Sequence, residues 1–484
     1  MTPLRRPTRV TTGRWQPNSP LQAGPGRQTQ PSSLARLVPD PNRLEYGYLR
    51  SNALSVRARA VIPHDDTGWM GTRSPFPLMS PAFIRQGAGC RVVDADGRSF
   101  IEYGAGRCPV GLGHGHPAVR QAVSMALRSG DAFSRPCIEE PEAAESLLKL
   151  LPDADMARFY TSEAEAVMAA VLLARAATGR SRVITLHKPD FEEWTADERS
   201  DGGHSRSLDP GALGDVLDGP GGPTAALLID AGGAADPETR WIQSCVEIAR
   251  EHGALLIFDE RTTGFRWAAG GAQRAYSCAP DLAVFGRSAT NGLPFAALTG
   301  SRALMRLLPH VDDSIFPGGA AYGETAASIL GLAALMAVVR VHTSDGVADI
   351  LHDRGRRLKA GAVDRIKSRG LETVLEVRGR VCRPIVVARD RDGQPSRHFQ
   401  ALLMQETIRH GVLMPTLAPS IAHDDTAIEQ TLDAFDMALE VYGRAIEAGV
   451  ETFLIGRISG PDATRIGKCD DDRCDAPTTL GQGA

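Results

Sequence analysis

The sequence has little net charge, no long apolar run and no dense set of cysteines. Its 54 basic residues nearly balance its 58 acidic residues, so no general field attracts nucleic acid. No stretch approaches the roughly eighteen consecutive apolar residues of a membrane span. The basic N-terminal residues are not followed by the apolar segment of a secretory signal. These absences argue against nucleic-acid binding and membrane spanning, and they predict a cytoplasmic protein.

The eight cysteines are spread along 484 residues, which is typical of reduced, mostly buried thiols and not of a disulfide framework. Only Cys469 and Cys474 look paired, and a lone C-x4-C in an Asp-rich tail is a weak metal signal. We therefore expect no metal at the functional site. Hydrophobic residues make up 42% of the chain, close to the average of globular proteins, so a sizeable core is expected.

The two ends of the chain differ in composition from its middle. Residues 1–40 are rich in Pro, Gly, Gln and Ser without periodicity, and residues 457–484 are similar, so both segments are predicted to be disordered. Near residue 343 one helical pattern gives way to a second amphipathic helix followed by alternating segments. The predicted organisation is an extension at 1–40, an N-terminal segment with small-lobe strands at 41–110, a large domain at 111–342, a small domain at 343–456 and a tail at 457–484.

Short apolar runs alternate with helical patterns in the predicted large domain. The runs lie at 182–186, 225–230, 254–259 and 281–285, each bounded by turn residues, as expected of buried strands. After Ser162, apolar residues recur at helical spacing until the pattern stops before 178–179. This alternation predicts an α/β fold with a mostly parallel sheet covered on both faces. The segments LETVLEVRG and CRPIVVARD further on predict an antiparallel pair in the smaller domain.

Three polar residues follow the ends of these predicted strands. Asp259 ends the run ALLIFD, His187 follows RVITL, and Arg287 follows DLAVF by one glycine. In parallel α/β sheets the ligand binds beyond the carboxyl ends of the strands. We therefore expect these side chains to face one crevice.

Several segments together resemble the class III aminotransferases, most closely their glutamate-1-semialdehyde aminomutase branch. They follow the order of the family from about residue 45 to residue 447, and they include GCRVVDADGRSFIEYGAG, GLGHGHPAV, ALLIFDERTTGFR, PDLAVFG and IAHDDTAIEQTL. The resemblance implies the type I fold of pyridoxal-phosphate (PLP)-dependent transferases and a homodimer with its active site at the subunit interface. It also implies PLP bound to a lysine as a Schiff base. Arg266, His114 and His116 match the family at positions where structural hydrogen bonding is expected.

Arg287 takes the place of the family's Schiff-base lysine. The family segment has the form L-G-K-x-x-G-x-G-L-P, and this chain reads FGRSATNGLP without a gap. A guanidinium stays protonated and is a poor nucleophile, so it can neither form the Schiff base nor act as a general base. Ordinary transamination is therefore not expected.

The positions that resemble the family's phosphate cradle are also altered. The turn N-S-G-T-E-A appears here with Ser162 kept, Glu163 in place of the glycine and Ala164 in place of the threonine. A carboxylate would then face a dianion at a helix N-terminus that normally attracts it. In the neighbouring subunit's segment, Tyr322 and Glu324 replace a serine and an asparagine, and Ala320 replaces a threonine.

At the positions that contact the cofactor ring in the family, this chain keeps one residue and changes another. Asp259, which pairs with the pyridinium nitrogen in the family, is retained, whereas Arg261 takes the place of an apolar residue on the ring's other face. Phe191 stacks on the ring only if the register slips by one residue. These changes predict that the chain binds no cofactor, and they leave weak binding or binding of pyridoxamine phosphate (PMP) open.

Two arrangements of the charged residues are possible. Arg287 and Arg261 could form a cationic site for a carboxylate or phosphate, or they could pair with Asp259 and Glu163 and fill the pocket. His187 or Lys188 could act in acid-base chemistry. The candidate catalytic residues are Arg287, Asp259, His187, Lys188, Glu163 and Tyr322. The candidate substrate-binding residues are Arg261, Arg287, Ser162, Glu324 and Arg73, and Asp259, Ser162 and Phe191 would contact PLP if it is retained.

Three functions fit this sequence. The first is a cofactor-independent enzyme that acts on a small anionic metabolite by isomerisation, elimination or condensation. The second is a non-catalytic scaffold that pairs with an active paralogue as a heterodimer. The third is residual PLP- or PMP-dependent aminotransferase or aminomutase chemistry without the lysine link, with Lys188 or His187 as the base. The fold alone does not decide among these three functions.

Overall fold

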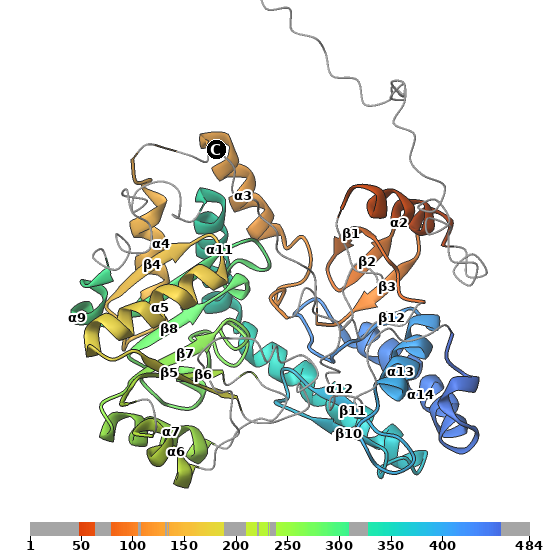
Figure 1. The fold of residues 1–484 in the computed structure, drawn as a ribbon. Helices are drawn as coiled ribbons and strands as arrows, with labels where there is room; N and C mark the ends of the chain where they lie inside the picture. The colour runs from red at the N-terminus through yellow and green to blue at the C-terminus, as the bar shows by residue number, and fades with distance from the viewer. Residues whose placement is uncertain are drawn as a thin grey trace, which may run out of the picture.

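The computed structural model describes residues 48–62, 79–104, 108–130, 133, 135–187, 210–219, 222–230, 232, 239–308 and 328–455. The segments predicted to be disordered, 1–40 and 457–484, lie outside these residues. Figure 1 shows a large sheet with its helices on the left and two smaller sheets with their helices on the right. Helix α12 (Val347–Ser368) lies between these two groups.

The large body is built on a six-stranded sheet in the order β4-β9-β8-β7-β6-β5. Strands β5 to β8 are parallel, whereas β9 runs antiparallel between β8 and β4. The four predicted strands are confirmed to within one residue at each end, and β4 and β9 were not predicted. The bounds are Met156–Tyr160 for β4, Arg182–His187 for β5, Thr224–Asp230 for β6, Leu255–Glu260 for β7, Leu282–Phe285 for β8 and Ala296–Gly300 for β9.

Helices cover both faces of this sheet, which explains why its central strands are apolar on both sides. On one face α5 (Glu163–Thr178) packs Leu173 and several alanines against strand residues such as Ile257 and Val284. The opposite face buries Phe258 and Phe285 under four further helices. These are α3 (Pro117–Ser129), α4 (Glu139–Leu148), α7 (Thr239–Glu251) and α11 (Ile329–Asp345), and the shorter α6 (Pro210–Leu217), α8 (Ala272–Ala275) and α9 (Arg302–Met305) complete the body.

The smaller body joins strands from both ends of the described chain. Strands β1 (Ile84–Ala88), β2 (Arg91–Asp94) and β3 (Ser99–Glu102) form an antiparallel meander, and β12 (Val412–Leu413) adds to β3 in parallel. The antiparallel pair predicted from the sequence is confirmed as β10 (Leu375–Arg378) and β11 (Ile385–Ala388). Helices α2 (Leu49–Val61), α13 (Arg397–Arg409) and α14 (Asp425–Ala448) lie around these sheets.

A buried arginine connects the large sheet to three distant segments of the chain. Arg266, in the turn after β7, is 2% exposed. Its Nη1 donates to the carbonyl oxygens of Cys382 at 3.0 Å and Pro419 at 2.9 Å, and its Nη2 donates to that of Cys108 at 3.0 Å. One side chain therefore holds three segments that lie more than a hundred residues from it in the chain.

Among the described residues, no single helix is both long and apolar enough to cross a membrane. Helices α11 and α12 pass this test only as a pair, and they are bent by 70° at the break between them.

Candidate functional site

The carboxyl ends of the parallel strands place the charged residues at one edge of the large sheet. Asp230 ends β6, Asp259 is the next-to-last residue of β7, and Arg287 follows β8. Because β4 is parallel to β8 across β9, the N-terminus of α5 reaches the same edge. His187 ends β5, two strands from β7, and strand spacing therefore places its backbone about 10 Å from that of Asp259.

Arg261 binds both carboxylate oxygens of Asp259. The Nε of Arg261 donates to Oδ1 of Asp259 at 2.7 Å, its backbone N–H donates to the same oxygen at 3.1 Å, and its Nη2 donates to Oδ2. The Asp259 side chain is only 4% exposed, whereas that of Arg261 is 39% exposed, so the pair joins a buried carboxylate to a guanidinium that reaches the solvent. Burial raises the pKa of Asp259, and the Arg261 guanidinium opposes that shift. Asp259 in turn raises the pKa of Arg261.

Glu163 and Arg287 form a second, separate pair. The backbone N–H of Arg287 donates to Oε1 of Glu163 at 2.9 Å, and its Nε lies 3.5 Å from the same oxygen. The carboxylate lies so close to Gly286 that a Cβ built there would be 2.1 Å from Oε1. The described structure therefore has the ion-paired arrangement of Arg261 and Arg287 and not a site with two free guanidinium groups.

The first turn of α5 offers open hydrogen-bond donors at the same edge. Ser162 caps the helix by accepting from the backbone N–H of Glu165, whose side chain accepts in return from the N–H of Ser162. The N–H groups of Glu163 and Ala164 precede the first intrahelical bonds, and no described residue accepts from them. Such a turn at the start of a 16-residue helix is a suitable position for an anion.

Glu260, the last residue of β7, is a buried carboxyl group that sequence reasoning missed. It is fully buried and accepts from the hydroxyl of Thr263 and from the backbone N–H groups of Ala272 at 2.7 Å and Gln273 at 2.9 Å. Burial raises its pKa to about 7. These contacts fix the turn after β7, and nothing in the D-E pair itself indicates that the second acid is buried.

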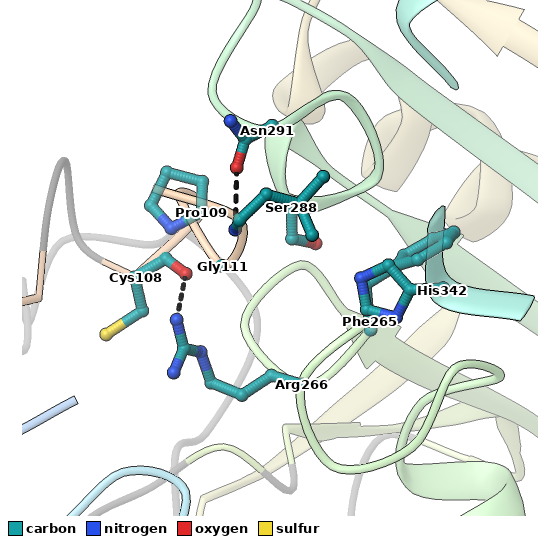
Figure 2. Close-up of a pocket in the computed structure, with 10 residues that line it drawn as sticks. Cys108, Pro109, Gly111, Phe265, Arg266, Ser288, Asn291 and His342 are labelled. Atoms are coloured by element: carbon teal, nitrogen blue, oxygen red, sulfur yellow. Dashed lines mark hydrogen bonds between the residues drawn. The ribbon is translucent and has the colours of Figure 1, made fainter. Parts of the chain in front are cut away.

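A small pocket lies next to the turn after β7 (Figure 2), and neither ion pair contributes a residue to its lining. Ser288 and His342 line it together with Arg266. The Oγ of Ser288 and the Nδ1 of His342 are buried, and neither has a hydrogen-bond partner in the described part of the chain. Burial, with the charge of Arg266, lowers the pKa of His342 to about 4, so its ring is neutral at pH 7.

Several predicted site residues lie outside the described part of the chain. They are Arg73, Lys188, Phe191, Tyr322 and Glu324, together with the side chain of His187. The structure therefore brings together Asp259 with Arg261, and Glu163 with Arg287. Ser162 lies at the same helix start as Glu163.

Lysine is scarce in this protein. The sequence has five lysines, and Lys188 and Lys468 lie outside the described residues. Lys149 follows α4, and Lys359 and Lys367 lie on α12, where Lys359 donates to the carbonyl oxygen of Gly379 at 2.9 Å. None of these three described lysines belongs to the strand ends that carry Asp259 and Arg287.

Comparisons with known proteins agree on one family. A profile of class III aminotransferases matches residues 76–189 and 218–436. The glutamate-1-semialdehyde 2,1-aminomutase of Paracidovorax citrulli is 33% identical over 354 residues, which cover 66% of this chain and 78% of that protein.

Two solved structures share the fold. The FumI protein of Sphingopyxis sp. MTA144, in its PLP internal aldimine form, has a TM-score of 0.71 and 24% identity, covering 82% of this chain and 98% of that one. A lysine-to-alanine variant of a glutamate-1-semialdehyde aminomutase from Pseudomonas aeruginosa PAO1, in complex with PMP, has a TM-score of 0.65 and 20% identity. That match covers 84% of this chain and 98% of the variant.

The prediction that the chain uses no cofactor is wrong. The matching profile and the aminomutase relative belong to a cofactor-dependent class, and solved neighbours of the same fold carry PLP or PMP, so the comparisons point to PLP use. The prediction failed because it treated each altered contact as a loss. The structure shows instead that the carboxylate of Glu163, expected to repel a phosphate, is paired with Arg287.

Proposed function

The chain belongs to the class III aminotransferase family, in its glutamate-1-semialdehyde aminomutase-like branch, and from this premise we propose that it holds a PLP-type cofactor without a covalent link to lysine. In this proposal the amine form, PMP, is the bound species, and the protein acts on the amino or carbonyl group of a small carboxylate metabolite. Arg287 carries the proposal: it follows β8 in the segment FGRSATNGLP, which resembles the lysine segment of the family.

The described residues fit both ends of such a cofactor. Asp259 is a buried carboxylate at the end of β7, suited to a ring nitrogen, and the open N–H groups of Glu163 and Ala164 are suited to a phosphate. Arg287 offsets the charge of Glu163 beside that phosphate position. In support, a lysine-to-alanine variant of a solved Pseudomonas neighbour of this fold is in complex with PMP.

The bound cofactor would supply the amino group and an electron-withdrawing ring. The protein would supply the remaining steps of the chemistry. Asp259 would hold the ring nitrogen in its charged form, and either His187 at the end of β5 or Lys188, the next residue in the sequence, would move the proton at the substrate carbon. Arg287 cannot replace lysine as that base because its guanidinium stays protonated.

The proposed functional unit is a homodimer. Large apolar side chains are exposed along α3 and just before α4, including Met125, Leu127 and Ile138. Exposed apolar side chains of this kind often mark contact between subunits. A heterodimer with an active paralogue would use the same surface.

Native mass spectrometry of the purified protein incubated with PMP tests the proposed function. We expect a dimer that retains PMP, and we expect denaturation to release all of it because no covalent bond holds it. After incubation with PLP and borohydride, no adduct should form at residue 287. The variant Lys188→Ala should retain PMP like the wild type. Failure to retain PMP, or a stoichiometric adduct at Lys188, would contradict the proposal.

Restoring the lysine alone should not restore a covalent cofactor. In Arg287→Lys the carboxylate of Glu163 keeps its place against Gly286, so a new ammonium group would be held by that carboxylate. The lost donors at the phosphate position are each worth roughly 1.5–3 kcal/mol and remain lost. We expect no lysine-linked absorbance band with PLP in Arg287→Lys. A strongly coloured single variant would show that Glu163 does not obstruct the site, and the double variant Glu163→Gly with Arg287→Lys is the matched comparison.

A further inference from the structure

Arg261 and a ring nitrogen would compete for the same carboxylate. Both oxygens of Asp259 already accept from Arg261, one from Nε at 2.7 Å and the other from Nη2. Since the carboxylate is only 4% exposed, it leaves little room for a second donor while the arginine keeps this position.

Arg261 is free to leave in a way that Arg287 is not. Among the described residues, every hydrogen bond made by the Arg261 side chain goes to Asp259, and the side chain is 39% exposed. Arg287 also binds Glu163 through its backbone N–H, and Glu163 is packed against Gly286. Releasing Arg261 therefore breaks one ion pair, whereas releasing Arg287 from Glu163 requires a change in the main chain.

We propose, building on the non-covalent cofactor site above, that Arg261 is an exchangeable partner of Asp259. It holds the carboxylate in the chain without cofactor, leaves when a ring nitrogen binds, and then receives the carboxylate of the substrate. The other two carboxylates near it are already occupied. Glu163 is paired with Arg287, and Asp230 accepts from the N–H of Gly232 at 2.8 Å. A released planar guanidinium is suited to bidentate binding of a carboxylate.

This exchange has two thermodynamic consequences. While Arg261 binds Asp259, the protein cannot bind PMP, so the apparent affinity for PMP scales with the fraction of molecules in which this pair is open. Cofactor binding also releases the group that receives a carboxylate, so the two ligands must strengthen each other's binding equally. Neither effect depends on turnover.

Titration of the fluorescence of PMP with wild-type protein, Arg261→Leu and Arg261→Gln tests the first consequence. We expect Arg261→Leu to bind PMP about tenfold more tightly than the wild type, because a partly exposed ion pair no longer competes. Arg261→Gln keeps an uncharged donor and carries the same test if the leucine variant does not fold. The control Arg250→Leu removes an exposed arginine on α7 and should leave PMP affinity unchanged. Equal or weaker binding by folded Arg261 variants would overturn the proposal.

The same titration in the presence of glutarate, a simple dicarboxylate, tests the second consequence, that PMP and a carboxylate strengthen each other's binding. Glutarate should tighten PMP binding by the wild type and have no effect in Arg261→Leu. If glutarate acts equally in both proteins, Arg261 is not its receptor and the proposal fails. If wild type and variants all fail to bind PMP, the proposed function falls and the exchange falls with it. Binding of PMP by the wild type with no change in the variants removes the exchange alone.

Discussion

Replacing Arg266 by methionine should lower the free energy of unfolding by about 3–6 kcal/mol, because three buried carbonyl oxygens lose a charged donor. These oxygens belong to Cys108, Cys382 and Pro419. Methionine keeps much of the length of the side chain but offers no N–H group. Urea denaturation followed by circular dichroism measures the change as a lower midpoint.

The matched control is Arg250→Met. Arg250 is exposed and donates to the carbonyl oxygen of Ala279 at 2.8 Å, so water can replace that bond, and the loss should stay below about 1 kcal/mol. If Arg266→Met unfolds at the same urea concentration as the wild type, the three long-range hydrogen bonds do not hold the segments together. The binding site would then need another source of rigidity.

Replacing Asp259 by asparagine should weaken PMP binding by about a hundredfold, the largest loss we expect from one substitution at the site. Two buried acids end β7 in the described chain. Glu260 is held by the turn that follows, so Asp259, which binds Arg261, is the acid that remains for a ligand. Asparagine keeps the shape but cannot stabilise a protonated ring nitrogen by charge. Equilibrium dialysis with PMP measures the change directly.

Asp218→Asn provides the control for this loss. Asp218 is an exposed acid whose Oδ2 lies 2.7 Å from Nδ1 of His252. His252 follows α7 and precedes β7, so this pair lies at the opposite end of the strand from Asp259. Its replacement should leave PMP binding unchanged. Should Asp259→Asn bind PMP as tightly as the wild type, the ring nitrogen is not held by this carboxylate, and the orientation of the cofactor proposed here is wrong.

The sequence predicted the central strands well because they are apolar on both faces. It did not predict β4 and β9. Strand β4 is only partly buried at an edge of the sheet, and β9 contains small residues and a threonine, so neither gives a long apolar run. The pairing of β4 with β9 joins segments that lie far apart in the chain, which a local pattern does not contain.

The candidate site was predictable as a set of residues but not as an arrangement. Spacing alone allowed Arg261 either to bind a ligand or to turn back on Asp259, and the turn after β7 places it on Asp259 in the described structure. That turn depends on the burial of Glu260, which is a tertiary property. Structural hydrogen bonding was expected for Arg266, His114 and His116. Arg266 and His114 make such bonds, the latter with Glu102 at 2.6 Å, whereas Nδ1 of His116 has no partner among the described residues.

The close contact between Glu163 and Gly286 restricts the order in which this site can change by mutation. Any side chain at residue 286 meets the carboxylate of Glu163, and removing either Glu163 or Arg287 leaves the other without its ion-pair partner. The effects of substitutions at these positions are therefore non-additive. A lysine at residue 287 would still be held by Glu163, so a lysine-linked site requires changes at both residue 163 and residue 287. Any evolutionary path back to such a site would therefore pass through a protein that carries only one of the two changes.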